Sequence, residues 1–150
     1  MEAIIKTGKG DMKVELYEKE TPKTVANFVK LAKDGFYDGL KFHRVLPDFV
    51  IQGGCPNSRD GAEGMAGTGG PGYQIDCEVN GEKQHHERGV LSMAHAGRNT
   101  GGSQFFVCHS RNNTAHLDGN HTCFGIVVDG LDVIDEIKQG DSIDSIVIVD

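Results

Sequence analysis

Residues whose side chains could act on a ligand are concentrated in Phe42–Gly54, where Arg44 precedes Phe49 by five residues and Phe49 precedes Gln52 by three. A turn is expected at Pro47-Asp48, so two short strands would bring these three side chains to one surface. A permanently charged guanidinium, an aromatic ring and an amide can hold and polarise a ligand, but they supply no nucleophile. Two further segments combine polar and aromatic residues in the same way, residues 92–106 and 117–125.

Neither the serines nor the carboxylate pairs have a spacing typical of covalent or acid–base catalysis. Ser103 lies in a Gly-Gly-Ser-Gln-Phe context, which lacks the G-x-S-x-G nucleophile elbow. The pairs Asp76/Glu78 and Asp135/Glu136 are better explained as the rim of a strand and the exposed face of a helix. The usual hydrolase signatures are therefore absent.

Metal and nucleotide binding are also disfavoured by the pattern. Gly67–Gly72 matches G-x-G-x-x-G, but a loop precedes it and no helix follows, so it is not a dinucleotide fingerprint. Among the cysteines and histidines of residues 108–123, only His116 and His121 are spaced like a pair of zinc ligands. The dipeptide His85-His86 is expected in a solvated turn. We expect no metal and no cofactor.

The elements that must position these residues are mostly short strands. Residues 4–17 read as a β-hairpin, and a helix is expected to begin with Thr21 as N-cap and Pro22 at its first position, and to stop at Gly35. A second helix is expected over 131–139, and a long glycine-rich loop over 53–74. The remaining runs predict strands at 40–46, 49–52, 89–94, 104–108, 124–128 and 143–149. This order predicts a mainly β protein, a closed antiparallel barrel with helices.

Composition places the chain among ordinary globular proteins. Its 150 residues fit a single domain over 1–150, and 37% are hydrophobic and 25% charged. No apolar run is long enough to cross a membrane, and the N-terminus turns polar too early for a signal peptide, so we expect a cytoplasmic protein without membrane contact. The net charge of −7 and the absence of a basic stripe argue against nucleic-acid binding. The four dispersed cysteines predict free thiols.

Two motifs together resemble the cyclophilin family of peptidyl-prolyl cis/trans isomerases. They are F-H-R-x-x-x-x-F-x-x-Q-G-G over residues 42–54 and S-M-A-x-A-G-x-N-T-x-G-S-Q-F-F over residues 92–106. The resemblance extends from the first expected strand to the last. It implies a closed eight-stranded antiparallel barrel capped by two α-helices, in agreement with the strand pattern.

The implied activity is rotation about X–Pro peptide bonds, which assists protein folding. Partial double-bond character sets a barrier of about 18–20 kcal/mol, and no bond is made or broken, so neither nucleophile, metal nor cofactor is required. A catalyst must favour the twisted amide, whose nitrogen accepts a hydrogen bond once its lone pair is freed. The resemblance gives this role to Arg44. The alternative is a non-catalytic module that binds proline peptides on the same barrel.

The resemblance also assigns the remaining site residues. Gln52 would bind the peptide carbonyl and orient Arg44, and His121 would close the rim as the third catalytic position. Period 2 places Phe105 and Phe106 on opposite faces of their strand, so one fills the barrel while the other faces the groove. Substrate contacts are implied for Phe49, Val50, Ala94, His95 (through its backbone), Gln104, Phe106, His116 and Leu117.

Three of these positions depart from the common family residues. Val50 stands where many relatives have methionine, His95 where asparagine is common, and His116 where many have tryptophan, after a slightly longer loop. We expect the substitutions at Val50 and His95 to preserve the isomerase activity. The third predicts weak binding of cyclosporin. We also expect a monomer whose partners are proline-containing, unfolded segments.

Overall fold

The computed structural model describes residues 1–149, which form eight strands and three α-helices. Short 3₁₀ turns lie at Pro56–Ser58 and Ala115–Leu117. The helices are α1 (Pro22–Lys33), α2 (Arg111–Thr114) and α3 (Leu131–Glu136). The strands are β1 (Glu2–Thr7), β2 (Gly10–Leu16), β3 (Arg44–Leu46), β4 (Val50–Gly53), β5 (Val90–Met93), β6 (Phe105–Cys108), β7 (Cys123–Asp129) and β8 (Ile143–Val149). The mainly β prediction is confirmed.

All strand pairs are antiparallel, in the order β3-β4-β6-β5-β7-β2-β1-β8. The prediction of a closed barrel is wrong, because β3 and β8 are the two edges of the sheet. Between them lie only a single bridge, Lys41 with Ser142, and backbone bonds such as Gly39 N–H to the Ile143 carbonyl at 2.8 Å. The positive φ of Gly39 (+77°) and Gly140 (+95°) bends both segments away from a regular ladder.

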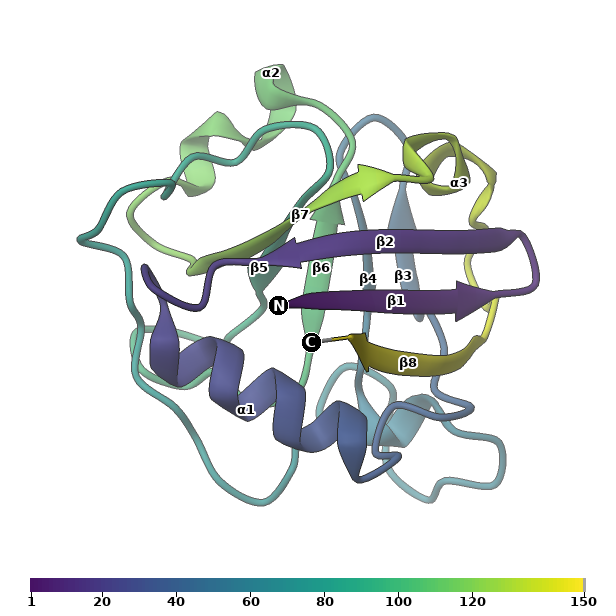
Figure 1. The fold of residues 1–150 in the computed structure, drawn as a ribbon. Helices are drawn as coiled ribbons and strands as arrows, with labels where there is room; N and C mark the ends of the chain where they lie inside the picture. Colours follow the sequence, from purple (N-terminus) through teal and green to yellow (C-terminus); the bar gives the residue numbers. More distant parts are fainter. Residues whose placement is uncertain (150) are drawn as a thin grey trace.

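The open sheet curls so that its two halves face each other (Figure 1). In the view of Figure 1, β1, β2 and β8 run across β3, β4 and β6, which lie behind them, and α1 covers one end of the space between. Phe28 of α1 fills this space, with its ring centroid 5.4 Å from Tyr37, 5.7 Å from Phe105 and 5.1 Å from Phe124. Contacts between these large, fully buried rings fix the curvature that the site requires.

Helix α1 begins where predicted, but its N-terminus is capped differently. The Thr21 hydroxyl donates to the Tyr17 carbonyl (3.0 Å) and makes no cap bond. Instead the Glu78 carboxylate accepts from both the backbone N–H and the hydroxyl of Thr24, at 2.6 and 2.7 Å. A carboxylate is well suited to the positive end of a helix. The loop before β5 is thereby fixed to α1.

The C-terminal ends of α1 and α3 are set by the backbone conformation of the residues that follow them. Gly35 has φ +74°, and the next residue donates to the Leu31 carbonyl at 3.0 Å, so the predicted glycine stop is confirmed. Helix α3 ends at Glu136 rather than near residue 139, because Ile137 is already extended (ψ 131°).

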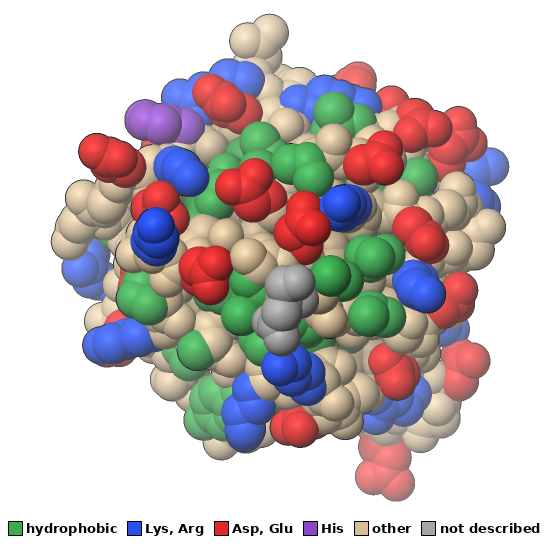
Figure 2. Space-filling view, viewed as in Figure 1, with side chains coloured by type: hydrophobic (Ala, Val, Ile, Leu, Met, Phe, Trp, Pro, Cys, Tyr) green, Lys and Arg blue, Asp and Glu red, His purple; other side chains and the backbone are tan. Residues whose placement is uncertain are grey.

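Acidic and basic side chains are interspersed over the face shown in Figure 2. Within residues 1–149, no helix is both long and apolar enough to span a membrane. All four cysteines are free, as predicted, and Cys55, Cys108 and Cys123 are buried.

Candidate active site

A second apolar cluster covers the outer face of the sheet, away from the barrel interior. It contains Tyr17, Val50, Val90, Phe106, Cys108 and Cys123 and is called the outer cluster below. The alternation predicted for β6 is confirmed: Phe105 belongs to the interior core, whereas Phe106 belongs to the outer cluster. Phe49, Ala94 and Leu117 are partly buried against the same cluster. The apolar residues named from the sequence therefore converge here.

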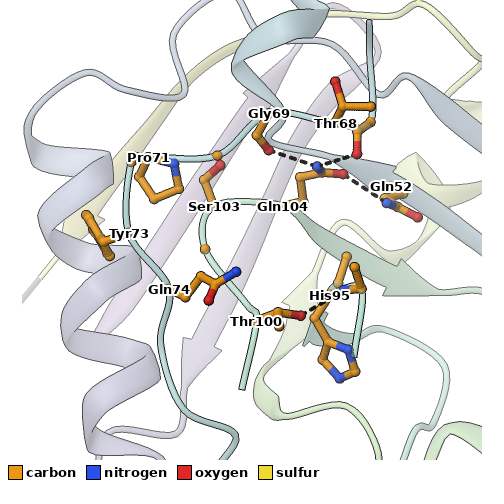
Figure 3. Close-up of a pocket in the computed structure, with 16 residues that line it drawn as sticks. Gln52, Thr68, Gly69, Pro71, Tyr73, Gln74, His95, Thr100, Ser103 and Gln104 are labelled. Atoms are coloured by element: carbon orange, nitrogen blue, oxygen red, sulfur yellow. Dashed lines mark hydrogen bonds between the residues drawn. The ribbon is translucent and has the colours of Figure 1, made fainter. Parts of the chain in front are cut away.

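Arg44 and Gln52 face each other across the β3–β4 ladder. They are direct register partners, and an Arg44 Nη1–H donates to Gln52 Oε1 at 3.2 Å. The Gln52 amide nitrogen in turn donates to Gln104 Oε1 at 3.1 Å. The side-chain amide nitrogen of Gln104 donates to the carbonyls of Gly67 (2.9 Å) and Gly69 (3.0 Å), drawn as dashed lines in Figure 3. This chain of amides leaves Gln52 Oε1 pointing at the guanidinium.

The glycine-rich loop is itself tied down, which is why it can anchor this chain. The Cys55 sulfur accepts the backbone N–H groups of Gly67 (3.2 Å) and Gly69 (3.3 Å). The Asn57 amide donates to the Thr68 hydroxyl at 3.2 Å. A buried thiol thus holds a loop that forms one wall of the site.

His121 stands beside Phe106, with its ring edge-on to the phenyl ring at a centroid distance of 5.5 Å. Its Nδ1–H donates to the Met93 carbonyl (2.9 Å), which leaves Nε2 as an acceptor. Burial lowers the pKa of His121. A neutral imidazole therefore borders the apolar surface formed by Phe106 and Val50, which are 4% and 2% exposed.

His95 uses its side chain within the protein. Its ring stacks on His121 with centroids 4.1 Å apart, and its Nδ1 accepts the Gly97 N–H at 3.1 Å. Its Nε2 is bonded to the Asn120 carbonyl. The imidazole is thus engaged on both nitrogens, which leaves the backbone for the substrate contact predicted from the sequence.

A cavity of about 840 Å³ adjoins the outer cluster, between the glycine-rich loop and the segment after β5 (Figure 3). Gln52, Ala94, His95 and Gln104 line it, so one predicted catalytic residue and three predicted substrate-binding residues meet at one edge. The sequence reasoning missed the opposite wall, for which loop length was the one available signal. That wall includes Thr68, Gly70, Pro71, Tyr73 and Gln74, whereas Thr100 and Ser103 line the cavity from the segment after β5.

His116 lies at the other rim of the outer cluster. Its exposed ring stacks on Phe49, with centroids 5.9 Å apart and planes inclined by 18°. It belongs to the 3₁₀ turn that follows α2, two elements that were not predicted. Their sequence, Arg-Asn-Asn-Thr-Ala-His-Leu, is too short and polar to show a helical period.

The whole arrangement combines an apolar floor, a neutral histidine rim and one guanidinium held by an amide. The model of the family described as "Cyclophilin type peptidyl-prolyl cis-trans isomerase" matches residues 3–149. The chain belongs to the cyclophilin family. A peptidyl-prolyl cis-trans isomerase of Helicobacter pylori is 55% identical over 147 residues, covering 97% of this chain and 85% of the relative.

Other relatives agree with this family membership. A peptidyl-prolyl cis-trans isomerase of Synechococcus elongatus is 53% identical over 150 residues, covering 99% of this chain and 96% of the relative. A cyclophilin of Cryptosporidium parvum, crystallised in the presence of the dipeptide Ala-Pro, superimposes with a TM-score of 0.81 at 34% identity. The alignment covers 99% of this cyclophilin and 95% of that chain.

We expect this cyclophilin to lose stability as the pH falls below about 6.5, the ordinary histidine value. Burial lowers the pKa of His43, His86, His109 and His121, whereas the unfolded chain titrates normally. Unfolding therefore takes up protons, and stability is full above the unfolded pKa and is lost as the pH falls toward the lower folded values. Melting temperatures between about pH 7.5 and pH 5.5 test this.

A variant pair makes the pH test specific. His109→Gln removes a largely buried imidazole and should flatten the decrease in melting temperature, whereas His116→Gln, at an exposed position, should change it much less. A melting temperature that stays constant or rises on acidification would contradict the expectation.

Proposed function

We propose that this cyclophilin accelerates rotation about X–Pro bonds in flexible polypeptide segments, with Arg44 as the donor to the prolyl nitrogen. The observation that supports this most directly is the Arg44–Gln52 pair at the border of the outer cluster. The proline ring is placed on Phe106, with Phe49, Val50 and Leu117 around it. The peptide continues past Ala94 and Gln104 toward the cavity.

The chemistry requires a site that prefers the twisted amide over both planar forms. In a planar X–Pro bond the nitrogen lone pair is delocalised and accepts no hydrogen bond; at the twisted geometry it does. A guanidinium aimed at that nitrogen therefore stabilises the transition state more than either ground state, which is the condition for a rate increase. The barrier of about 18–20 kcal/mol is lowered without covalent chemistry.

Gln52 has a positioning role in this proposal. Its Oε1 accepts from Arg44 while its amide nitrogen is held by Gln104, so the guanidinium is oriented before substrate arrives. A donor oriented in advance costs no reorganisation when the amide twists. The same Gln52 amide borders the path of the peptide, where it can also meet a substrate carbonyl.

His121 is proposed to close the rim of the pocket. Its neutral ring is fixed by the Met93 carbonyl and by stacking on His95. A fixed apolar edge limits the pocket to a ring of the size of proline, and Nε2 stays available as an acceptor. His116, stacked on Phe49, extends the binding surface outward for larger ligands.

The rival reading is a peptide-binding module without catalysis. Binding a proline ring needs the outer cluster but gains little from an oriented guanidinium, so the Arg44–Gln52–Gln104 chain favours the enzyme. Exchange spectroscopy on an Ala-Pro peptide separates the two, because a module would bind the peptide without accelerating its isomerisation. We further propose a cytoplasmic monomer, and its free thiols suit the reducing compartment.

A further inference from the structure

A row of polar side chains, His86, Ser92 and Asp118, lies directly beneath the outer cluster, and the first two are fully buried. The imidazole of His86 is fully buried, contrary to the solvated turn expected for His85-His86. Its Nδ1 lies 2.8 Å from Asp118 Oδ1 and its Nε2 lies 2.8 Å from the Ser92 hydroxyl. The carboxylate fixes Nδ1 as the protonated nitrogen, so the Ser92 hydroxyl donates to Nε2.

This row has the order of a hydrolase triad but not its access. In hydrolases the serine hydroxyl must reach the substrate. Ser92 is 0% exposed and sits in β5, where it pairs with Phe106 of β6. Directly paired residues share a face of the sheet, so the Ser92 hydroxyl lies on the same face as Phe106 and is covered by the His86 ring that it bonds. No substrate can reach it there, so the row has another use.

The His86 ring supports two members of the site. It lies nearly parallel to the ring of Phe106, with centroids 5.9 Å apart and planes inclined by 17°. It is edge-on to the ring of His121, with centroids 6.5 Å apart. His86 therefore backs both the floor and the rim of the proposed proline pocket.

Asp118 connects this ring to the segment that carries the rim. It directly follows Leu117 and accepts the backbone N–H of His86 at 2.8 Å, in addition to the ring Nδ1–H. Arg111 pairs with its other oxygen at 2.7 Å. The Thr114 hydroxyl donates to the His86 carbonyl, also at 2.8 Å. The segment 111–121 is thus fastened to residue 86 at two separate points.

We propose that the His86–Asp118 pair is a clasp that sets the spacing between Phe106 on one side and Leu117 and His121 on the other. Both residues are positioning residues for binding of the proline ring. The inference rests on the proposed function. It differs from a plain stabilising role, because the clasp fixes the width of the pocket and leaves Arg44 untouched.

Asp118→Ala is the direct test. Loss of the clasp should raise KM for an Ala-Pro peptide by about tenfold or more, the range expected for a lost hydrogen bond to a charged group, while kcat stays within about twofold. Asp118→Asn keeps an Oδ1 acceptor for His86 and should recover most of the lost affinity. A role of the negative charge itself would leave Asp118→Asn as impaired as Asp118→Ala.

A matched control is the neighbouring group Arg88, His109 and Asp135, which contains none of the proposed site residues. Asp135 accepts from Arg88 at 2.9 Å and lies 3.5 Å from His109, so it combines the same three residue types outside the site. Asp135→Ala should leave KM unchanged. NMR signals of the Phe106 and His121 rings should move in Asp118→Ala and stay in place in Asp135→Ala. If Asp118→Ala does not fold, Arg111→Met, at an exposed position, should give a smaller rise in KM.

The outcomes separate the clasp from the proposed function. Unchanged KM and unmoved ring signals in folded Asp118→Ala, a loss confined to kcat, or no rescue by Asp118→Asn would each overturn the clasp. An unmodified protein that isomerises no peptide would overturn the proposed function instead. The ring signals and the dissociation constant of the peptide would then still test the clasp.

Discussion

Arg44→Ala is expected to lower kcat/KM for X–Pro isomerisation by about tenfold to a hundredfold or more. A hydrogen bond from a charged donor contributes roughly 1.5–3 kcal/mol net, and each 1.4 kcal/mol is about tenfold in rate. Arg44 is exposed and its bond to Gln52 lies at the surface, so the fold should tolerate the change. An exchange assay together with a melting temperature measures both effects.

Two companion variants define what Arg44 contributes. Arg44→Lys should recover little, because an ammonium does not reproduce the planar fork of donors. Arg59→Ala removes a guanidinium that bonds the Phe36 carbonyl, away from the site, and should leave turnover unchanged. A folded Arg44→Ala variant with nearly full activity would show that another group stabilises the twisted amide.

Inhibition by cyclosporin is expected to be weak in this cyclophilin. The resemblance to cyclophilins with tryptophan at the position of His116 implies an indole face and an N–H donor for the drug, and histidine has a smaller ring. Losing several tens of Å² of apolar contact at about 25 cal/mol per Å² costs on the order of 1–2 kcal/mol, or about tenfold in affinity. The stacking of His116 on Phe49 further limits the freedom of its ring to meet the drug.

His116→Trp should therefore tighten cyclosporin inhibition by about tenfold. Turnover of a short Ala-Pro peptide should change much less, because Phe106 and Val50 form the floor of the pocket. Val128→Trp, at an exposed position of β7, controls for the added indole. Nanomolar inhibition of the unmodified protein would contradict the expectation and would mean that the loop before His116 supplies the contact in another way.

Sequence patterns predicted much of the fold where a structural feature depends on a few neighbouring residues. The alternation of β6 placed Phe105 and Phe106 on opposite faces, and Gly35 ended α1, since a single residue and its neighbours decide each case. The facing positions of Arg44 and Gln52 were predicted for the same reason, because the turn at Pro47-Asp48 fixes the register of the two strands.

What the sequence could not predict depends on partners distant in the chain. Thr21 was expected to cap α1, but Glu78, more than fifty residues later, occupies the donors. His86 was assigned to solvent, yet it is buried because Asp118 neutralises the cost of hiding an imidazole. Barrel closure failed because two glycine turns, at the ends of separate segments, interrupt the last ladder. A short stretch of sequence cannot show such contacts, because the two partners lie far apart in the chain.

The central claim is catalysis of X–Pro rotation, and exchange NMR on an Ala-Pro peptide with substoichiometric protein tests it most directly. In free peptide the isomers interconvert over tens to hundreds of seconds, so cis and trans signals are separate. We predict that the unmodified protein, with a chelator present, produces exchange between these signals within about a second, and that Arg44→Ala largely abolishes it. Peptide signals that shift on binding while exchange stays at the uncatalysed rate would contradict the account and establish a binding module instead.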